Sequence, residues 1–175
     1  VSLVPSLTEL LFDLGLGDRL VGRTAFCVHP ACRIKAVRSV GGTKTVNWSK
    51  LRQAAPTHIL VNIDETPRAL ADDLAAAGYA VVVTHPVDVA DNLALYRLLG
   101  GVFGAEPAAA ALCSRFERAY AAAVSEAEGR PRRRVLYLIW QNPWMTVTPA
   151  TYVAKMLALA GWDTQPPVAE RRYPE

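Results

Sequence analysis

Short apolar runs alternate with helical segments over the first 85 residues of this chain. Residues 58–62 and 80–84 are mostly apolar, without polar alternation, which is typical of strands buried on both faces. Between them, residues 67–77 form a helical segment that Pro67 opens and Gly78 closes. Because parallel strands are usually joined by a crossover helix, this alternation predicts a parallel sheet with helices on its faces.

The first sixty residues extend the same pattern. Residues 1–4 predict a short strand, and Ser6 followed by Glu9 predicts a capping box at the start of a helix. Leucines at positions 7, 10, 11 and 14 then fall on one helical face. Asn47 predicts the N-cap of a short helix over residues 48–55, which Pro56 terminates.

The alternation stops between Asp88 and Glu128, where about forty residues have helical character and no strand signal. A kink or a split in this helical segment is predicted by Gly100, Gly101, Gly104 and Pro107. A strand over residues 135–139 and a helix over residues 152–160 follow. We therefore expect an α/β fold with an N-terminal lobe (1–87), a connecting helix (88–128) and the start of a C-terminal lobe (129–175).

Composition and motifs exclude several classes of function. No run approaches the ~20 consecutive apolar residues of a membrane helix. The net charge is +3, and the basic run at residues 130–134 has no interleaved aromatic residues, so no nucleic-acid partner is expected. The three cysteines form no zinc-type CxxC pair, and neither a phosphate loop nor a GxSxG elbow is present. We expect a protein that is not an enzyme and has no intrinsic cofactor.

A resemblance to a known family covers nearly the whole chain. It is carried by residues 1–11, 17–23, 26–30, 40–42, Asn47 with Leu51, 55–61 and 134–143. These stretches resemble the periplasmic cobalamin-binding proteins, which belong to the helical-backbone metal receptors that also serve iron-siderophore and haem uptake. The resemblance implies two Rossmann-like lobes joined by a long backbone helix. The chain begins in a strand and stops without a closing element, so we expect both ends to be incomplete and the second lobe to be truncated.

The resemblance also implies a function. Such proteins are substrate-binding components of ABC importers, and here the ligand would be a corrinoid held in the cleft between the lobes. A ferric siderophore or haem receptor is the first alternative. The second is an intracellular metal- or tetrapyrrole-handling protein, chelatase-like, that uses Cys27 and His29. The expected partner is an ABC permease, and the expected state is a monomer. The expected location is periplasmic or extracytoplasmic, and a lipid anchor is compatible with that location.

Candidate ligand-binding residues follow the ends of predicted strands, because ligands gather beyond the carboxyl ends of parallel strands. By this rule we select Pro5 and Ser6, Phe26, and residues 62–65 beginning with Asn62. The fourth place is the loop from Trp140 to Trp144, where two indoles could present flat surfaces to a planar macrocycle.

The resemblance adds to this set. It implies that Phe26 is an aromatic wall residue and that the loop with Asn142 meets the ligand. Thr43 and Lys44 are ligand-binding candidates where some cobalamin binders have an aromatic residue. His29 and His85 are the candidate metal ligands, although the family's direct metal binders use three histidines and a carboxylate.

Docking on the permease involves a carboxylate on each lobe in this family. The first-lobe carboxylate would fall at Ser49, so the acid is absent at that position. Glu65 is the candidate substitute, with Asp72 and Asp73 as alternatives.

Overall fold

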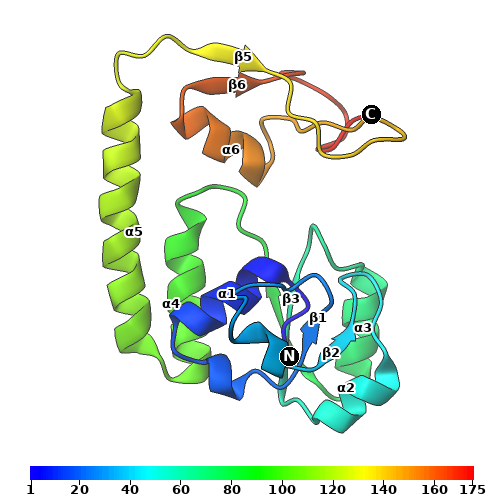
Figure 1. Ribbon diagram of the computed structural model, residues 1–175. Helices are drawn as coiled ribbons and strands as arrows, with labels where there is room; N and C mark the ends of the chain where they lie inside the picture. Colours follow the sequence, from blue (N-terminus) through cyan, green and yellow to red (C-terminus); the bar gives the residue numbers. More distant parts are fainter. The chain divides into compact units, whose positions relative to one another are not determined.

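The computed structural model describes all of residues 1–175 and divides them into two compact units. Unit 1 comprises Val1–His85 and Leu99–Leu112, and unit 2 comprises Pro86–Leu98 and Cys113–Glu175. The lobe boundaries expected at residues 87 and 128 stay a prediction. The elements, most of which are labelled in Figure 1, are α1 (Pro5–Asp13), η1 (Gly17–Arg19), β1 (Arg23–Thr24), η2 (Ile34–Ala36), β2 (Ser39–Gly41), α2 (Trp48–Ala54), β3 (His58–Asn62), α3 (Arg68–Ala76), β4 (Ala80–Thr84), α4 (Asp91–Phe103), α5 (Glu106–Ala127), β5 (Arg133–Val135), α6 (Tyr152–Leu159) and β6 (Trp162–Thr164).

Unit 1 is built on a parallel sheet. β1 pairs with β2, and β3 pairs with β4 in register from His58–Ala80 to Asn62–Thr84. The first residues of the chain join the two pairs, because Ser2 forms parallel bridges to both Arg23 and Leu60. The order is therefore β2, β1, residues 1–3, β3, β4, with every strand parallel, as the alternating sequence predicts.

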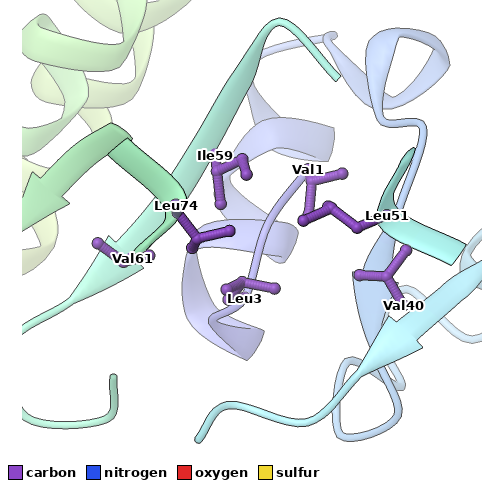
Figure 2. Close-up of a cluster of buried hydrophobic side chains, with 7 residues drawn as sticks. All are labelled: Val1, Leu3, Val40, Leu51, Ile59, Val61 and Leu74. Atoms are coloured by element: carbon purple, nitrogen blue, oxygen red, sulfur yellow. The ribbon is translucent and has the colours of Figure 1, made fainter. Parts of the chain in front are cut away.

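Apolar side chains on one face of this sheet form the core of unit 1. Figure 2 shows seven of them, which are at most 9% exposed: Val1, Leu3, Val40, Leu51, Ile59, Val61 and Leu74. Leu51 comes from α2 and Leu74 from α3, so these two helices cover the same face. Leu60, between Ile59 and Val61 on the strand, is directed to the opposite face and is also buried. Burial on both faces explains why β3 has no polar alternation.

The start of α1 differs from the expected capping box. The helix begins at Pro5, its N-cap is Val4, and no side chain caps it. Proline favours the first helical position because its φ is already helical and its missing N–H needs no acceptor. Ser6 consequently lies inside the first turn rather than before it, so the Ser6–Glu9 capping box is wrong. The leucine face is confirmed, since Leu7, Leu10, Leu11 and Leu14 are all buried.

Three other local predictions in unit 1 are confirmed. The Asn47 side chain caps α2 by accepting a hydrogen bond from the Lys50 amide at 2.9 Å. Helix α2 ends at Ala54, just before Pro56, and α3 ends just before Gly78, whose φ of 88° is left-handed. Short-range signals of this kind act through neighbouring residues, so they survive whatever the rest of the chain does.

The helical segment after unit 1's sheet is divided, as its glycines predict. Helix α4 ends at Phe103 and α5 begins at Glu106, with Gly104 between them at a φ of 66°. Gly100 lies in α4 where an added Cβ would come within 2.6 Å of the Ala109 Cβ on α5. The small residue at this position thus permits the two helices to approach closely.

Unit 2 contains a short parallel ladder in which β5 pairs with β6, from Arg133–Trp162 to Val135–Thr164. The expected strand over residues 135–139 is therefore misplaced: the ladder occupies residues 133–135 and ends where the apolar run begins. Residues 136–138 have no ladder partner, so their backbone is not held in a sheet. Helix α6 is confirmed, with Thr151 as its N-cap and Gly161 just beyond its end.

Candidate ligand-binding site

The carboxyl ends of the unit 1 strands lie at one edge of the sheet, because all the strands are parallel. In chain order the first strand segment, residues 1–3, lies in the middle of the sheet, between β1 and β3. The chain leaves this position first toward β1 and β2 and later continues at β3 on the other side. The edge between residues 1–3 and β3 is thus a topological switch point, where open α/β sheets bind ligands. Pro5 follows the first strand segment at this point, and Asn62 is the last residue of β3.

Pro5 and Ser6 form the first turn of α1 at this edge. Pro5 is half-buried and Ser6 is exposed. The first N–H groups of a helix have no acceptor within it, and the helix dipole adds positive potential at that end. With no side-chain cap on α1, the Ser6 backbone N–H and hydroxyl offer hydrogen bonds to a ligand oxygen.

Phe26 follows β1 and is exposed over 63% of its surface. A Cβ built on Gly42 would lie 3.6 Å from Phe26 Cε2, so the ring packs against the backbone after β2. Val28, in the same loop, is also exposed. An aromatic ring supported on one side and open to solvent is suited to stacking on a flat apolar ligand.

The loop after β2 carries Thr43 and Lys44 at its tip. Gly41 has a φ of 139° and bridges to Val46, while the Gly42 amide donates to the Thr45 carbonyl at 2.8 Å. This tight turn requires glycine at position 41, because an added Cβ would lie 2.6 Å from the Thr45 carbonyl oxygen. Thr43 is half-buried and Lys44 is exposed, so an ammonium group is available beside the Phe26 loop.

Asn62 ends β3 and shapes the turn that follows. Its side-chain oxygen accepts a hydrogen bond from the Asp64 amide at 2.8 Å, and its side-chain nitrogen donates to Thr84 Oγ1 at 3.5 Å. The Thr84 hydroxyl in turn donates to the Val61 carbonyl at 2.9 Å. Both functional groups of the Asn62 amide are thus engaged, and its principal role in this structure is to fix the turn at residues 62–65.

Three ionisable groups gather at the ends of β3 and β4. His85 Nε2 lies 3.6 Å from Asp64 Oδ1. Burial, and to a lesser extent the neighbouring Asp64 carboxylate, raises the pKa of Glu65 above its ordinary value. Glu65 is half-buried at the same edge as Asn62. The sheet edge is therefore acidic after β3 and β4, whereas the loop after β2 carries the basic Lys44.

Neither candidate metal ligand lies in a metal-binding cluster. His29 is exposed in the loop after Phe26, and His85 contacts Asp64. No group of three or more His, Cys, Asp or Glu side chains is arranged to hold a metal ion. A zinc or manganese site needs about four ligands, so the donor set around either histidine is too small.

Trp140, Asn142 and Trp144 lie in unit 2 on a turn closed by two backbone hydrogen bonds. The Met145 amide donates to the Trp140 carbonyl at 3.1 Å, and the Ile139 amide donates to the Met145 carbonyl at 2.9 Å. The indoles are 64% and 56% exposed, and Asn142 has a left-handed φ of 64°. Neither tryptophan fills the core of unit 2, so both are available to a ligand.

The sequence did not indicate a hollow that the structure forms beside Asn62. It has a volume of about 450 Å³, and its lining includes Ile63, Thr66, Arg68 and Val83. Ile63 is 57% exposed, and the buried Thr66 hydroxyl has no hydrogen-bond partner. Ile63 stands alone between polar residues, so periodicity could not mark it. Its place directly after a strand end was the one available signal.

The edge of unit 1 thus has the properties of a binding surface: an open helix N-terminus, an exposed aromatic ring and polar groups at strand ends. The model of the periplasmic binding protein family matches residues 1–166, and the chain belongs to that family. Because this is a family of binding proteins, the expectation that the chain is not an enzyme is confirmed. No helix has the length and apolar character needed to cross a membrane.

Two vitamin B12-binding proteins are similar to this chain. A vitamin B12-binding protein of Yersinia pestis is 32% identical over 89 residues, which cover 51% of this chain and 31% of that protein. The chain therefore matches about a third of the length of this curated relative. The crystal structure of the periplasmic vitamin B12-binding protein of Vibrio cholerae matches 99% of the chain and 68% of its own length, at 19% identity and a TM-score of 0.88.

Haem-binding proteins have the same fold. The periplasmic haem-binding protein from Roseiflexus matches 99% of the chain and 68% of its own length, at 23% identity and a TM-score of 0.85. The two-lobe α/β expectation is confirmed by this shared fold, and the resemblance to the cobalamin and haem receptors is confirmed by the family match.

Proposed function

We propose that this chain belongs to a substrate-binding protein that captures a corrinoid and delivers it to an ABC importer. The observation that carries the proposal is the exposed Phe26 ring, supported by Gly42 and placed at the carboxyl edge of the unit 1 sheet. A corrin is a large, nearly planar ring whose apolar face can stack on an aromatic side chain. Its peripheral amides suit the hydrogen-bonding groups at the same edge, notably Ser6 at the open end of α1.

In this proposal the unit 1 residues have distinct roles. Phe26 supplies the apolar wall, and Pro5 and Ser6 present the open helix end. Thr43 and Lys44 flank the ring with a hydroxyl and a cation, and Asn62 fixes the turn beside it. In unit 2, Trp140 and Trp144 supply further aromatic surface, and Asn142 shapes their loop. The vitamin B12-binding relatives support the corrinoid as cargo.

Haem is the second candidate ligand, and one observation favours it. His29 is exposed three residues after Phe26, and an imidazole beside an aromatic wall could ligate the iron of a stacked haem. The haem-binding structures with the same fold support this alternative. A ferric siderophore is the third candidate. The chelatase-like alternative is set aside because the family is one of binding proteins.

The proposed partner is an ABC permease, and the proposed location is outside the cytoplasmic membrane, as for periplasmic binding proteins. We keep Glu65 as the docking carboxylate of the first lobe. Asp72 is a weaker candidate because Arg68 lies 3.6 Å away and offsets its charge. We propose a monomer, with no nucleic-acid partner and no resident cofactor.

Titration calorimetry of the chain with cyanocobalamin, haemin and a ferric hydroxamate tests the proposal. We expect micromolar affinity for cyanocobalamin and about a tenfold loss in Phe26→Ala, as for a buried aromatic contact. Val21→Ala, an exposed apolar change before β1, is the control and should leave affinity unchanged. Binding of haemin alone would transfer the proposal to haem. Binding of divalent zinc with none of the three chelates would contradict all three candidates.

A further inference from the structure

Cys27 is a buried residue beside the exposed Phe26 in the loop after β1. Its side chain is 1% exposed, whereas its neighbours Phe26 and Val28 are 63% and 56% exposed. His29 is exposed, so the pairing of Cys27 with His29 that a chelatase-like reading requires has no support in the structure. The thiol instead contacts two threonine hydroxyls. These come from different elements, Thr8 from α1 and Thr24 from β1.

Short distances connect these three side chains to the backbone of the loop. Cys27 Sγ lies 3.1 Å from Thr8 Oγ1 and 3.2 Å from Thr24 Oγ1. The Phe26 amide donates to Thr24 Oγ1 at 3.2 Å, and the Cys27 amide donates to the Thr24 carbonyl at 3.2 Å. Both threonines are fully buried, so these contacts are shielded from water. A buried polar group that loses its partner is destabilised, which gives such a cluster a defined geometry.

The available protons allow the contacts to form one chain. The Thr8 hydroxyl can donate either to Cys27 Sγ or to the Val4 carbonyl, which is 3.0 Å away. A hydroxyl has one proton, so while Thr8 donates to Val4 the thiol proton is free to point at Thr8 Oγ1. Thr24 can then donate to the sulfur while it accepts from the Phe26 amide. The Phe26 backbone is thereby connected through Cys27 to the first turn of α1.

We propose that Cys27 is a positioning residue for ligand binding, because it fixes the Phe26 loop relative to the N-terminus of α1. The two groups that it connects, the aromatic ring and the open helix end, are both among the parts of unit 1 assigned above to contact the ligand. The inference therefore rests on the proposed function. It adds that affinity depends on a side chain that does not touch the ligand, through the order of the loop that does.

Cys27→Ala tests this role, with Cys113→Ala as the matched control. Cys113 is also a buried free thiol, but it lies in unit 2 and donates to the Leu93 carbonyl. We expect Cys27→Ala to raise the hydrogen-exchange rate of the Phe26 amide about tenfold relative to the core amide of Leu51, the size of effect a lost hydrogen bond produces. We expect a similar loss of affinity for cyanocobalamin or haemin, whichever the unaltered chain binds.

Cys27→Ser separates hydrogen bonding from packing, because serine keeps a donor and an acceptor in a smaller side chain. It should restore most of the protection of the Phe26 amide. Thr8→Val, which removes the other end of the contact at nearly constant volume, should behave like Cys27→Ala and serves if the alanine variant does not fold. An unchanged Phe26 exchange rate in both Cys27→Ala and Thr8→Val would overturn the proposal. If the unaltered chain binds none of the probes, the proposed function fails, while the exchange rates still decide the positioning role.

Discussion

Similar apolar sequences are buried in unit 1 and exposed in unit 2. In unit 1 the run containing Ile59, Leu60 and Val61 is buried, with exposed fractions of at most 1%. In unit 2 the run after β5 is exposed, and Leu136 and Leu138 have exposed fractions of 59% and 48%. The difference lies in the neighbours. β3 has a strand segment on each side, whereas β5 has a described partner, β6, over three residues.

The two units also differ in the share of polar side chains among their buried residues. Unit 1 buries many more hydrophobic side chains than polar ones, although Thr8, Thr24 and Thr84 are among its buried residues. The buried residues of unit 2 include several threonines whose hydroxyls donate to backbone carbonyls, such as Thr146 to Tyr137 at 2.8 Å and Thr148 to Arg172 at 3.1 Å. An apolar run therefore specifies a preference for burial, but the flanking elements decide whether burial is achieved.

The largest expected effect is on stability, from removing a leucine in each run. Leu60→Ala should lower the free energy of unfolding of unit 1 by about 2–5 kcal/mol, since it leaves a cavity in a closely packed core. Leu138→Ala should change stability by less than about 0.5 kcal/mol, because the side chain is already half in water. Urea denaturation of each variant measures both. Equal costs would show that the two runs are buried to the same degree and would break the comparison.

Glycine turns give the next largest contrast. Gly41→Ala should cost roughly 1–3 kcal/mol through left-handed strain, with an added clash 2.6 Å from the Thr45 carbonyl oxygen. Gly161 in unit 2 has a φ of 82°, but a Cβ added there would meet no atom within 4 Å. Gly161→Ala should therefore lower the free energy of unfolding by only about 1 kcal/mol. Thermal unfolding compares the two. If Gly41→Ala proved as mild as Gly161→Ala, the Thr43 and Lys44 turn would be more adaptable than its hydrogen bonds indicate.

The N-caps of α6 in unit 2 and α2 in unit 1 reverse the ranking, because here the larger effect is expected in unit 2. Thr151 in unit 2 is fully buried, accepts from the Ala154 amide and donates to the Thr148 carbonyl. Asn47 in unit 1 is exposed and accepts from the Lys50 amide. Thr151→Ala should cost about 2 kcal/mol and Asn47→Ala about 1 kcal/mol, because the unpartnered groups at Asn47 can bind water. The reverse ranking in urea denaturation would indicate that the polar interior of unit 2 is loosely held.

The smallest expected effect depends on pH. The pKa of Glu65 is raised in the folded chain, so folding favours the protonated form of this side chain. The contribution of Glu65 to the free energy of unfolding therefore falls as pH rises through the ordinary carboxyl range. Glu65→Gln should therefore be more stable than the unaltered chain by about 0.5 kcal/mol or less at about pH 7, since the group is partly solvated. The advantage should vanish at about pH 3. Glu9→Gln, on the exposed face of α1, is the control. A pH-independent gain from Glu65→Gln would contradict the raised pKa.

Local sequence signals predicted the parts of the fold that depend on near neighbours. Asn47, Gly78 and Gly104 fix backbone conformations through their own side chains or lack of them, so the ends of α2, α3 and α4 follow from the sequence. The capping box at Ser6 failed because Pro5 supplied a stronger signal one position earlier. The strand predicted over residues 135–139 was misplaced for a different reason. Ladder formation requires a second strand, which no local pattern can supply.

The candidate site also has features that the sequence predicted and features that it did not. The sequence by itself placed Pro5, Phe26 and Asn62 after strands, and parallel pairing was sufficient to bring their strand ends to one edge. Only the tertiary structure decided the strand order that makes this edge a switch point, the hollow beside Ile63, and the burial of Cys27 between Thr8 and Thr24. Strand order and burial depend on contacts between residues distant in the chain, which the spacing of side chains along a single segment does not encode.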